Sequence, residues 1–528
     1  MFKRTQPVFL TFLISLTVSC LLQFIAGCNS FHRNKSHSNV PLSSIKAGKA
    51  LAEVYCQSCH SLPDPGHLNA ATWEKGVLPN MGPRLGIFAH NSQSYPSRKN
   101  DIMLGPNFYP QAPVITPQQW QHIIDYYSAT APDTLAEQHR EHVIDKNLPL
   151  FKAQVPSLQY NDAMTSFIKL NEQDSLRRLI ISDVGRQKVF FLNKNLQLID
   201  SVHTKGPVVN MELFQNTMLA CNIGVFYPNN KSYGKASYIR MDESKKLKED
   251  TASLFDQLKR PVQISAGDLN NDGREDFLIC EFGYMAGRLC WMESTGNRNY
   301  KRHVLRAMPG AIKAYIQDYN KDGKLDIWVL FAQGEEGVFL YTNNGNGQFS
   351  EQEVLRFPPS YGSSYFELAD FNNDGYPDIV YTCGDNADYS PVLKPYHGVY
   401  IFINDKTNGF GQRFFFPING CYKAMARDFD KDGDLDLATI AYFADFTTQP
   451  EEGFVYLENK GNLTFRPHSI EAAKQGRWLT MDAGDIDGDG WTDLVLGNFC
   501  LGPTLSKSNY NWRTAAPFIL LKNRGQKN

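Results

Sequence analysis

The chain has 528 residues, of which 20% are charged and 42% are hydrophobic, and its formal net charge at pH 7 is −2. A chain of this length exceeds what one hydrophobic core usually supports, so we expect two or more domains. The near-neutral charge gives no strongly basic surface for nucleic acid, so we expect no nucleic-acid partner. Its 39 glycines, 28 prolines and 12% aromatic residues favour a body rich in strands and turns.

The first residues have the pattern of a targeting segment rather than of a folded element. Two basic residues precede an apolar run over 8–26, and the run ends in "FIAGC", whose last residue is Cys28. Small residues before a cysteine resemble the lipobox of bacterial lipoproteins. The resemblance implies a signal peptide over 1–27, a lipid on Cys28 and a lipidated tether over 28–42. The alternative is an uncleaved membrane anchor, because the run is nearly long enough to span a bilayer.

Both interpretations place the rest of the chain outside the cytoplasm. We therefore expect a protein of the cell envelope, lipid-anchored and either periplasmic or on the cell surface, with the membrane as a partner through the anchor.

The stretch "YCQSCH" contains two cysteines separated by two residues and followed at once by a histidine. This C-x-x-C-H spacing is typical of c-type haem attachment. The thiols of Cys56 and Cys59 would form thioethers with the two vinyl groups of one porphyrin, and His60 would bind the iron as the proximal ligand. The alternatives are a disulfide or half of a zinc site, but the chain has no second C-x-x-C. The motif predicts one covalent haem c.

Two helices are expected to flank this motif. Residues 43–60 predict a helix with a serine cap that ends at the motif. Residues 114–132 predict a second helix, with Thr116 as N-cap and Gln119 completing a capping box. An opening helix that carries C-x-x-C-H and a closing amphipathic helix resemble the class I cytochromes c. The resemblance covers about 43–132 and implies a small all-α haem domain.

A methionine is usually the second axial ligand in such cytochromes, and it raises the potential of the iron. Met81 lies in "LPNMG", a setting that resembles cytochromes fused to propellers, whereas Met103 lies at the more usual distance from His60. We expect Met81 as the distal ligand, with Met103 as the second choice. Either would otherwise be a packing residue. His67 and His90 are further alternatives.

Five acidic stretches of the form D-x-[DN]-x-D-G-x-x-D recur about every fifty to sixty residues in the second part of the chain. They occupy residues 268–276, 318–326, 370–378, 428–436 and 485–493. Positions 1, 3, 5 and 9 offer carboxylate or amide oxygens, position 7 offers a backbone carbonyl, and the glycine at position 6 permits a sharp turn. A calcium EF-hand is excluded, because position 12 is never acidic and lies in an apolar, strand-like run.

These loops predict up to five calcium sites. The residues expected to bind, with position 7 acting through its backbone carbonyl, are Asp268, Asn270, Asp272, Arg274, Asp276, Asp318, Asn320, Asp322, Lys324, Asp326, Asp370, Asn372, Asp374, Tyr376, Asp378, Asp428, Asp430, Asp432, Asp434, Asp436, Asp485, Asp487, Asp489, Trp491 and Asp493. We expect calcium to stiffen turns rather than to catalyse, since clustered carboxylates without a cation repel one another.

Strand-like stretches surround each loop, and the hairpins that follow are rich in asparagine and glycine. Four short strands in a unit of about fifty residues are typical of a propeller blade. The units resemble the FG-GAP/VCBS repeats, also found in the integrin α-subunit propeller, whose loops of this type bind calcium. Residues 175–202 and 206–228 have the strands without the loop, which gives seven blades over 164–528. We expect the strand at 165–170 to complete the last blade and close the ring.

Six cysteines lie outside the amino-terminal segment and the haem motif. They are Cys221, Cys280, Cys290, Cys383, Cys421 and Cys500. In an oxidising compartment they could form disulfides, and Cys280 and Cys290, which flank a predicted hairpin, are the best pair. Free buried thiols are the equal alternative.

The expected fold class is therefore multidomain, with a small all-α cytochrome c domain over 43–132, a linker over 133–163 and an all-β propeller of seven four-stranded blades. No nucleophile, phosphate-binding loop or acid–base pair stands out, which favours a redox carrier over a catalyst. We expect electron transfer with a partner protein, with the propeller as docking or ligand-binding scaffold. The alternatives are a cytochrome-bearing subunit of a periplasmic dehydrogenase, and an adhesion or carbohydrate-binding module with a redox-sensing haem.

Overall fold

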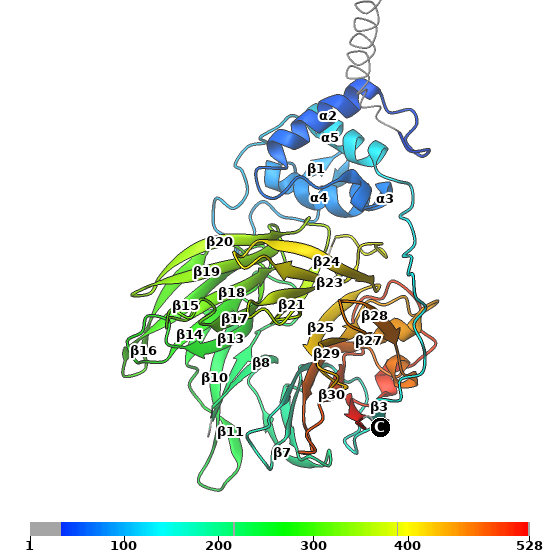
Figure 1. Ribbon diagram of the computed structural model, residues 1–528. Helices are drawn as coiled ribbons and strands as arrows, with labels where there is room; N and C mark the ends of the chain where they lie inside the picture. The colour runs from blue at the N-terminus through cyan, green and yellow to red at the C-terminus, as the bar shows by residue number, and fades with distance from the viewer. Residues whose placement is uncertain (1–32, 215–216, 388, 526–528) are drawn as a thin grey trace, which may run out of the picture.

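The structure is a computed structural model that describes residues 33–214, 217–387 and 389–525. The predicted signal peptide over 1–27 and the predicted lipid acceptor Cys28 lie outside the described residues. Within the described part, no helix is both long and apolar enough to cross a membrane. Figure 1 shows a small helical part resting on a large body of strands.

Two helices, α2 (Leu42–Tyr55) and α5 (Pro117–Thr130), pack against each other and organise the helical part. Gly48 lies where they cross, and a Cβ there would stand 1.8 Å from the carbonyl oxygen of His122, so this approach requires glycine. The chain between them forms short elements: Pro65–His67, α3 (Ala70–Thr72), Trp73–Val77, α4 (Leu78–Met81), Gly82–Leu85, β1 (Ala89–His90) and β2 (Gln93–Ser94).

The two helices begin differently. At α5 the Thr116 side chain accepts from the Gln119 N–H at 3.2 Å and the Gln119 side chain accepts from the Thr116 N–H at 2.8 Å, so the predicted capping box is confirmed. The predicted serine cap of the first helix is wrong, because α2 begins after Pro41. Ser44 lies inside that helix, and its hydroxyl instead joins α5 at His122 Nδ1, 2.6 Å away.

The strand body is a seven-bladed β-propeller of antiparallel blades, as predicted. The strands are given from the axis outward. The first blade contains β4 (Thr165–Leu170), β5 (Leu179–Asp183), β6 (Lys188–Leu192) and β7 (Leu198–His203), and the second contains β8 (Val208–Leu213), β9 (Thr217–Asn222), β10 (Gly234–Met241), β11 (Leu247–Glu249) and β12 (Phe255–Leu258). The third blade contains β13 (Pro261–Gly267), β14 (Asp276–Glu281), β15 (Arg288–Gly296) and β16 (Asn299–Arg306), and the fourth contains β17 (Ala311–Gln317), β18 (Asp326–Phe331), β19 (Gly337–Gly345) and β20 (Gln348–Arg356). The second blade alone has a fifth strand, because β11 and β12 both pair with β10.

The other three blades follow the same antiparallel order. They contain β21 (Ser363–Ala369), β22 (Asp378–Cys383), β23 (Gly398–Asn404) and β24 (Phe410–Pro417); β25 (Cys421–Arg427), β26 (Asp436–Ala441), β27 (Phe454–Asn459) and β28 (Phe465–His468); and β29 (Trp478–Gly484), β30 (Asp493–Asn498), β31 (Phe518–Asn523) and β3 (Phe151–Gln154). Each predicted acidic loop joins the first strand of its blade to the second.

The ring closes by pairing the two ends of the propeller chain, but not with the strand that we predicted. The outer strand of the last blade is β3, which pairs with β31 and comes from the predicted linker over 133–163. The stretch 165–170 is instead β4, the innermost strand of the first blade. The physical reason is local, since β4 pairs along its length with β5, the next strand in the sequence.

A polar side chain on the innermost strand of every blade bonds to the backbone of the innermost strand of the next blade. The seven bonds are Ser166 Oγ to Val208 O at 2.8 Å, Ile264 N to Asn210 Oδ1 at 3.1 Å, Ala314 N to Gln263 Oε1 at 2.9 Å, Tyr315 OH to Phe366 O at 3.2 Å, Ala426 N to Glu367 Oε2 at 2.7 Å, Lys423 Nζ to Met481 O at 2.6 Å, and Leu170 N to Asp482 Oδ2 at 2.8 Å. The last bond joins the seventh blade to the first, so the bonds form a closed ring around the axis.

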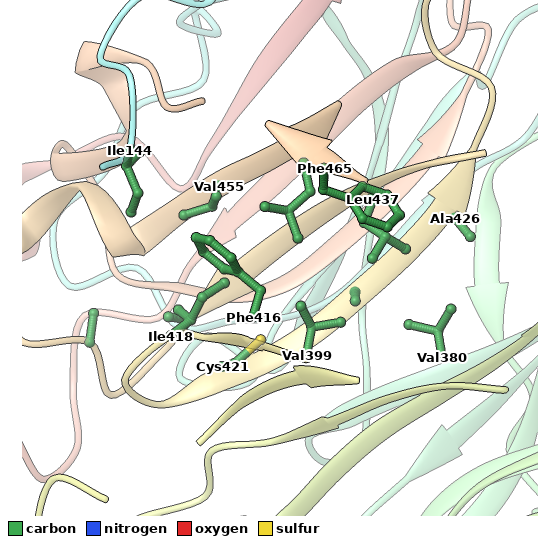
Figure 2. Packing of buried hydrophobic residues seen from close by; sticks show 14 of the residues in the cluster. Ile144, Val380, Val399, Phe416, Ile418, Cys421, Ala426, Leu437, Val455 and Phe465 are labelled. Carbon is green, nitrogen blue, oxygen red and sulfur yellow. The ribbon is translucent and has the colours of Figure 1, made fainter. Parts of the chain in front are cut away.

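Apolar side chains fill the spaces between neighbouring blades. Figure 2 shows one such cluster, in which Val380 and Val399 of the fifth blade meet Leu437 and Val455 of the sixth. Ile144, from the segment that leads into the propeller, is buried in the same cluster. This segment is therefore held against the propeller before β3 begins.

The eight cysteines in the described part of the chain are all free, and the six in the propeller are buried. The predicted pairing of Cys280 with Cys290 is wrong. Cys290 is the cross-strand partner of Ile279, one residue before Cys280, so the two side chains leave the sheet on opposite faces and enter different apolar clusters. The alternative of free buried thiols is confirmed.

The helical part touches the propeller through specific polar contacts. The Tyr396 hydroxyl donates to the carbonyl oxygen of His67 at 3.0 Å, and the Ser360 hydroxyl lies 3.1 Å from the Nδ1 of the same histidine. On another side of the junction, the Arg84 guanidinium lies 3.3 Å from the sulfur of Met285. These contacts fix which surface of the helical part faces the propeller.

Candidate functional site

The predicted haem-binding residues lie together in the first turn after α2. Cys56 directly follows the helix, and its N–H donates to the carbonyl oxygen of Ala52 at 2.9 Å. Cys56 and His60 are half-buried, whereas Cys59 is exposed. Neither cysteine is in a disulfide. Both thiols are therefore available to a porphyrin at the end of a rigid helix.

The hydrogen bond of His60 defines its protonation. Its Nδ1 lies 2.8 Å from the backbone oxygen of Ser61, and a carbonyl oxygen only accepts, so Nδ1 carries the proton. Burial is the main influence on the pKa of His60 and lowers it, which favours the neutral ring. Nε2 then keeps its lone pair, which is the form of histidine that binds a metal.

Several half-covered apolar side chains pack against the same buried cluster as Cys56. Cys56, Leu62, Val77, Met81 and Leu85 all pack, partly exposed, against the buried cluster of the helical part. Burial also raises the pKa of the Cys56 thiol to about 11. Half-covered apolar surface in the helical part, together with two free thiols and a neutral imidazole, fits a covalently bound porphyrin.

The structure places the two methionines differently. Met81 is the last residue of α4 and packs against the same cluster as Cys56, whereas Met103 is 43% exposed in a loop. His67 is held by the propeller, and the Nε2 of His90 lies 2.7 Å from the side-chain oxygen of Gln121. Met81 as distal ligand stays a prediction, and its position fits better than those of the alternatives.

The five acidic loops share one backbone geometry. In each, the aspartate at position 1 accepts the N–H groups of positions 5 and 6, as Asp268 does from Asp272 at 3.1 Å and from Gly273 at 2.8 Å. The glycine at position 6 has a positive φ, for example 79° at Gly273 and 101° at Gly433. This conformation favours glycine, so the role expected for position 6 is confirmed.

Two of the loops bring three carboxylates close together. In 428–436 the oxygens of Asp428, Asp430 and Asp432 all lie within 4.8 Å of one another, and in 485–493 the same is true of Asp485, Asp487 and Asp493. Clustered oxygens of this kind are the donor set that calcium prefers. The chemistry of these loops therefore fits a hard divalent cation.

The aspartate at position 9 has a structural role as well as a possible ligand role. All five such residues are fully buried, and each accepts a backbone N–H from the third strand of its own blade, as Asp436 does from Asn459 at 2.8 Å. In four loops it also accepts the N–H of position 2. The carboxylate thus anchors the loop to the blade, and its remaining lone pairs can still face a cation.

The sequence reasoning missed a repeated asparagine that completes this anchor. The residues are Asn343, Asn404, Asn459 and Asn523. The backbone N–H of each donates to the position 9 aspartate, and its side-chain NH2 group donates to the carbonyl oxygen of position 8. Its side-chain oxygen accepts the backbone N–H of the residue two positions later. The signal was present, since an asparagine stands near the end of the third strand in four of the five blades with an acidic loop, whereas the blade of 268–276 has Ser294 there.

The loops differ in how their charge is balanced. Position 5 of the second and third loops pairs with a lysine, at 2.8 Å for Asp322 and 3.5 Å for Asp374. In the described chain, no lysine or arginine forms an ion pair with the acids of 428–436. Burial and the charge of neighbouring Asp432 raise the pKa of Asp430 to about 6. This loop therefore holds the most uncompensated negative charge.

The fold is a seven-bladed β-propeller, and two of its acidic turns group carboxylates that could hold a metal ion. Residues 268–329 and 318–381 match the family model described as FG-GAP-like repeat, which confirms the repeat type predicted from the sequence. The matched residues lie within the propeller, so the haem and the lipid stay predictions.

Three solved structures align with this chain, each at 10% identity over 73% of its length. They are BBS1N in complex with ARL6DN (TM-score 0.43, 99% of that chain), the N-terminal domain of Nup159 (0.41, 99%), and an S. cerevisiae complex of Dbp5 with Nup159, Gle1, IP6 and ADP (0.39, 97%).

Proposed function

We propose that this chain is an extracytoplasmic electron-transfer protein that carries one covalent c-type haem, with a calcium-binding propeller as its docking scaffold. The observation that carries the proposal is the placement of C-x-x-C-H at the end of α2, with a neutral His60 whose Nε2 keeps its lone pair and with half-covered apolar side chains in the same helical part. The haem would accept and donate single electrons.

The residues of the chain would have distinct roles. Cys56 and Cys59 would hold the porphyrin covalently, so that it is not lost outside the cell. Ser61 orients the His60 ring through its carbonyl oxygen. Met81 would complete the iron coordination, and lipid on Cys28 would keep the protein at the membrane.

The propeller would share the surface on which a redox partner docks. Glu335 and Arg356, both in the fourth blade, are among the charges that act on the pKa of His60, although burial dominates. The two side chains also pair with each other at 3.4 Å. Charges of the propeller thus lie near the proposed haem site, where they would contribute to partner recognition.

Calcium would occupy the acidic loops and stabilise the propeller. The two triads of close carboxylates support this role. We expect the tightest binding at 428–436, since this loop has the most acidic residues and no paired lysine or arginine in the described chain.

The haem proposal is tested by producing the protein in a host that matures c-type cytochromes. The purified protein should show a c-type pyridine haemochrome spectrum and an increase in mass of one haem that survives denaturation. Replacing Cys56 and Cys59 by serine should abolish the covalent mass, whereas Cys500→Ser, at a cysteine far from the motif, should not. An intact protein of apoprotein mass from a host that matures a control cytochrome would refute the proposal.

A further inference from the structure

Charged side chains from several blades converge at the axis of the propeller. Lys169 on β4, Lys313 on β17 and Lys423 on β25 belong to three different blades. Lys313 and Lys169 are both among the charges that act on the pKa of Lys423. The three amines therefore lie near one another, although more than a hundred residues separate each from the next in sequence.

Water reaches these side chains despite their central position. Lys313, Lys423, Tyr315 and Tyr365 all lie on innermost strands, and all four are only half-buried. Lys169 is further exposed, at 46% of its side chain. A small solute that enters with the water can therefore contact the amines.

An apolar cluster lies against the starts of three innermost strands. Its buried members contact residues at the starts of three innermost strands; the buried residues are Val184, Tyr442, Phe443 and Phe499, and the strand residues are Val209, Tyr422 and Leu479. The innermost strands run from this cluster toward the acidic loops. We infer that solutes approach the lysines from the side of the acidic loops.

The carboxylates near the axis are already engaged. Glu367 accepts a backbone N–H of the next blade and pairs with Arg427 at 2.9 Å. Asp482 likewise accepts a backbone N–H of the next blade and pairs with Lys169 at 3.5 Å. Glu212 also faces these charges, and burial raises its pKa. Three lysines and one arginine thus face these three carboxylates, and the charge of Glu275 also acts on Glu212.

Two of these lysines form no ion pair within 4 Å in the described part of the chain, although the charges of Asp482 and Glu367 act on both. Lys313 Nζ lies 4.6 Å from the centre of the Tyr315 ring and has neither a hydrogen-bond acceptor nor an ion-pair partner there. Lys423 Nζ lies 4.8 Å from the Tyr365 ring and donates only to the Met481 carbonyl. Burial lowers the pKa of both amines, that of Lys423 to about 8. Buried cations of this kind are stabilised by an anion.

We propose that Lys313 and Lys423 form a binding site for a small oxyanion, a phosphate or carboxylate group, on the axis of the propeller. The two ammonium groups supply donors for charge-assisted hydrogen bonds, and the tyrosine rings hold the lysine side chains in place. The site is independent of whatever the N-terminal part binds.

The proposal is tested on the intact protein by calorimetric titration with inorganic phosphate, sulfate and succinate, with sodium chloride of equal ionic strength as reference. At least one oxyanion should bind, and the double substitution of Lys313 and Lys423 by methionine should weaken its affinity about tenfold or more, because two charged donors are lost. Binding of phosphate but not of succinate would identify the ligand group as a phosphate, and the reverse would identify it as a carboxylate. Substitution of the exposed Lys194 and Lys248 by methionine should change nothing. No binding by any of the three, or equal binding by the double variant, would overturn the proposal.

A second measurement covers the case in which the double variant does not fold. Acylation of wild-type lysines at about pH 8 can be followed residue by residue with mass spectrometry, and Lys423 is partly deprotonated at this pH. The binding oxyanion should protect Lys423 from acylation and leave Lys194 unprotected. Equal labelling of Lys423 with and without the anion would overturn the proposal.

Discussion

Glu336 is a fully buried carboxyl group whose neighbours stabilise it only in part. It lies between β18 and β19, is 3% exposed, and accepts from the Ser363 N–H at 2.8 Å and the Ser363 hydroxyl at 2.6 Å. Burial nevertheless dominates and raises its pKa from 4.5 to about 7. We predict that Glu336→Gln makes the stability of the protein less dependent on pH.

The direction follows from proton linkage. Because the pKa of Glu336 is higher in the folded than in the unfolded state, the folded state binds more protons between pH 4.5 and about 7, and stability falls as the pH rises through this range. The shift of about 2.5 units corresponds to about 3 kcal/mol, at about 1.4 kcal/mol per unit. Glutamine keeps an oxygen for Ser363 and carries no charge, so the substitution removes this loss.

The assay is unfolding by urea or heat at about pH 5 and about pH 8, at which Glu336 is mostly protonated and mostly ionised, respectively. The free energy of unfolding of Glu336→Gln minus that of wild type should be about 3 kcal/mol more favourable to the variant at about pH 8 than at about pH 5. Glu243→Gln, at an exposed residue, serves as the control and should show no such change. A constant difference between Glu336→Gln and wild type across this range would refute the reasoning.

Three further predictions concern the loops and the haem site. Chelation of calcium should lower the melting temperature. The increase in melting temperature that calcium causes should be reduced more by Asp432→Asn than by Asp322→Asn, because the Asp322 carboxylate already pairs with a lysine. Equal reductions in the two variants would contradict this. Asn459→Ala should lower the free energy of unfolding by about 1–3 kcal/mol in urea titrations, since it leaves buried backbone groups unpaired, and a change below about 0.5 kcal/mol would contradict it. Met81→Ala should abolish the methionine-to-iron absorption band and Met103→Ala should keep it; the reverse would exchange the two assignments.

The propeller could be predicted from the sequence because its signals are local. Each acidic loop fixes a turn within nine residues, and the flanking strands follow directly, so the loops indicated the blade type and five of the blades, and the strand pattern at 175–202 and 206–228 indicated the other two. The closing strand could not be found in this way. The pairing of Phe151–Gln154 with Phe518–Asn523 joins residues at opposite ends of the propeller chain, and β3 has no loop beside it to mark its place.

The lysines at the axis and the asparagine anchors could not be predicted from the sequence for a different reason. Lys313 and Lys423 are ordinary lysines in strand-like sequence, and only the closed ring brings them together. The asparagines were visible as hairpin residues, yet a turn explains an asparagine without any contact to a distant aspartate. The contact depends on the register of the third strand, which places Asn459 against Asp436, 23 residues earlier.

These anchors change the role that calcium can have. The position 9 aspartate is held by backbone N–H groups of its own blade, and the position 1 aspartate by those of positions 5 and 6, so hydrogen bonds within the protein contribute to the turn geometry of each loop. A preformed loop loses little conformational freedom on binding, so more of the binding free energy appears as affinity. The same hydrogen bonds to backbone N–H groups also hold the loops to their blades. Bound calcium would then add to the stability of the propeller, most of all where carboxylates such as those of 428–436 would otherwise repel one another.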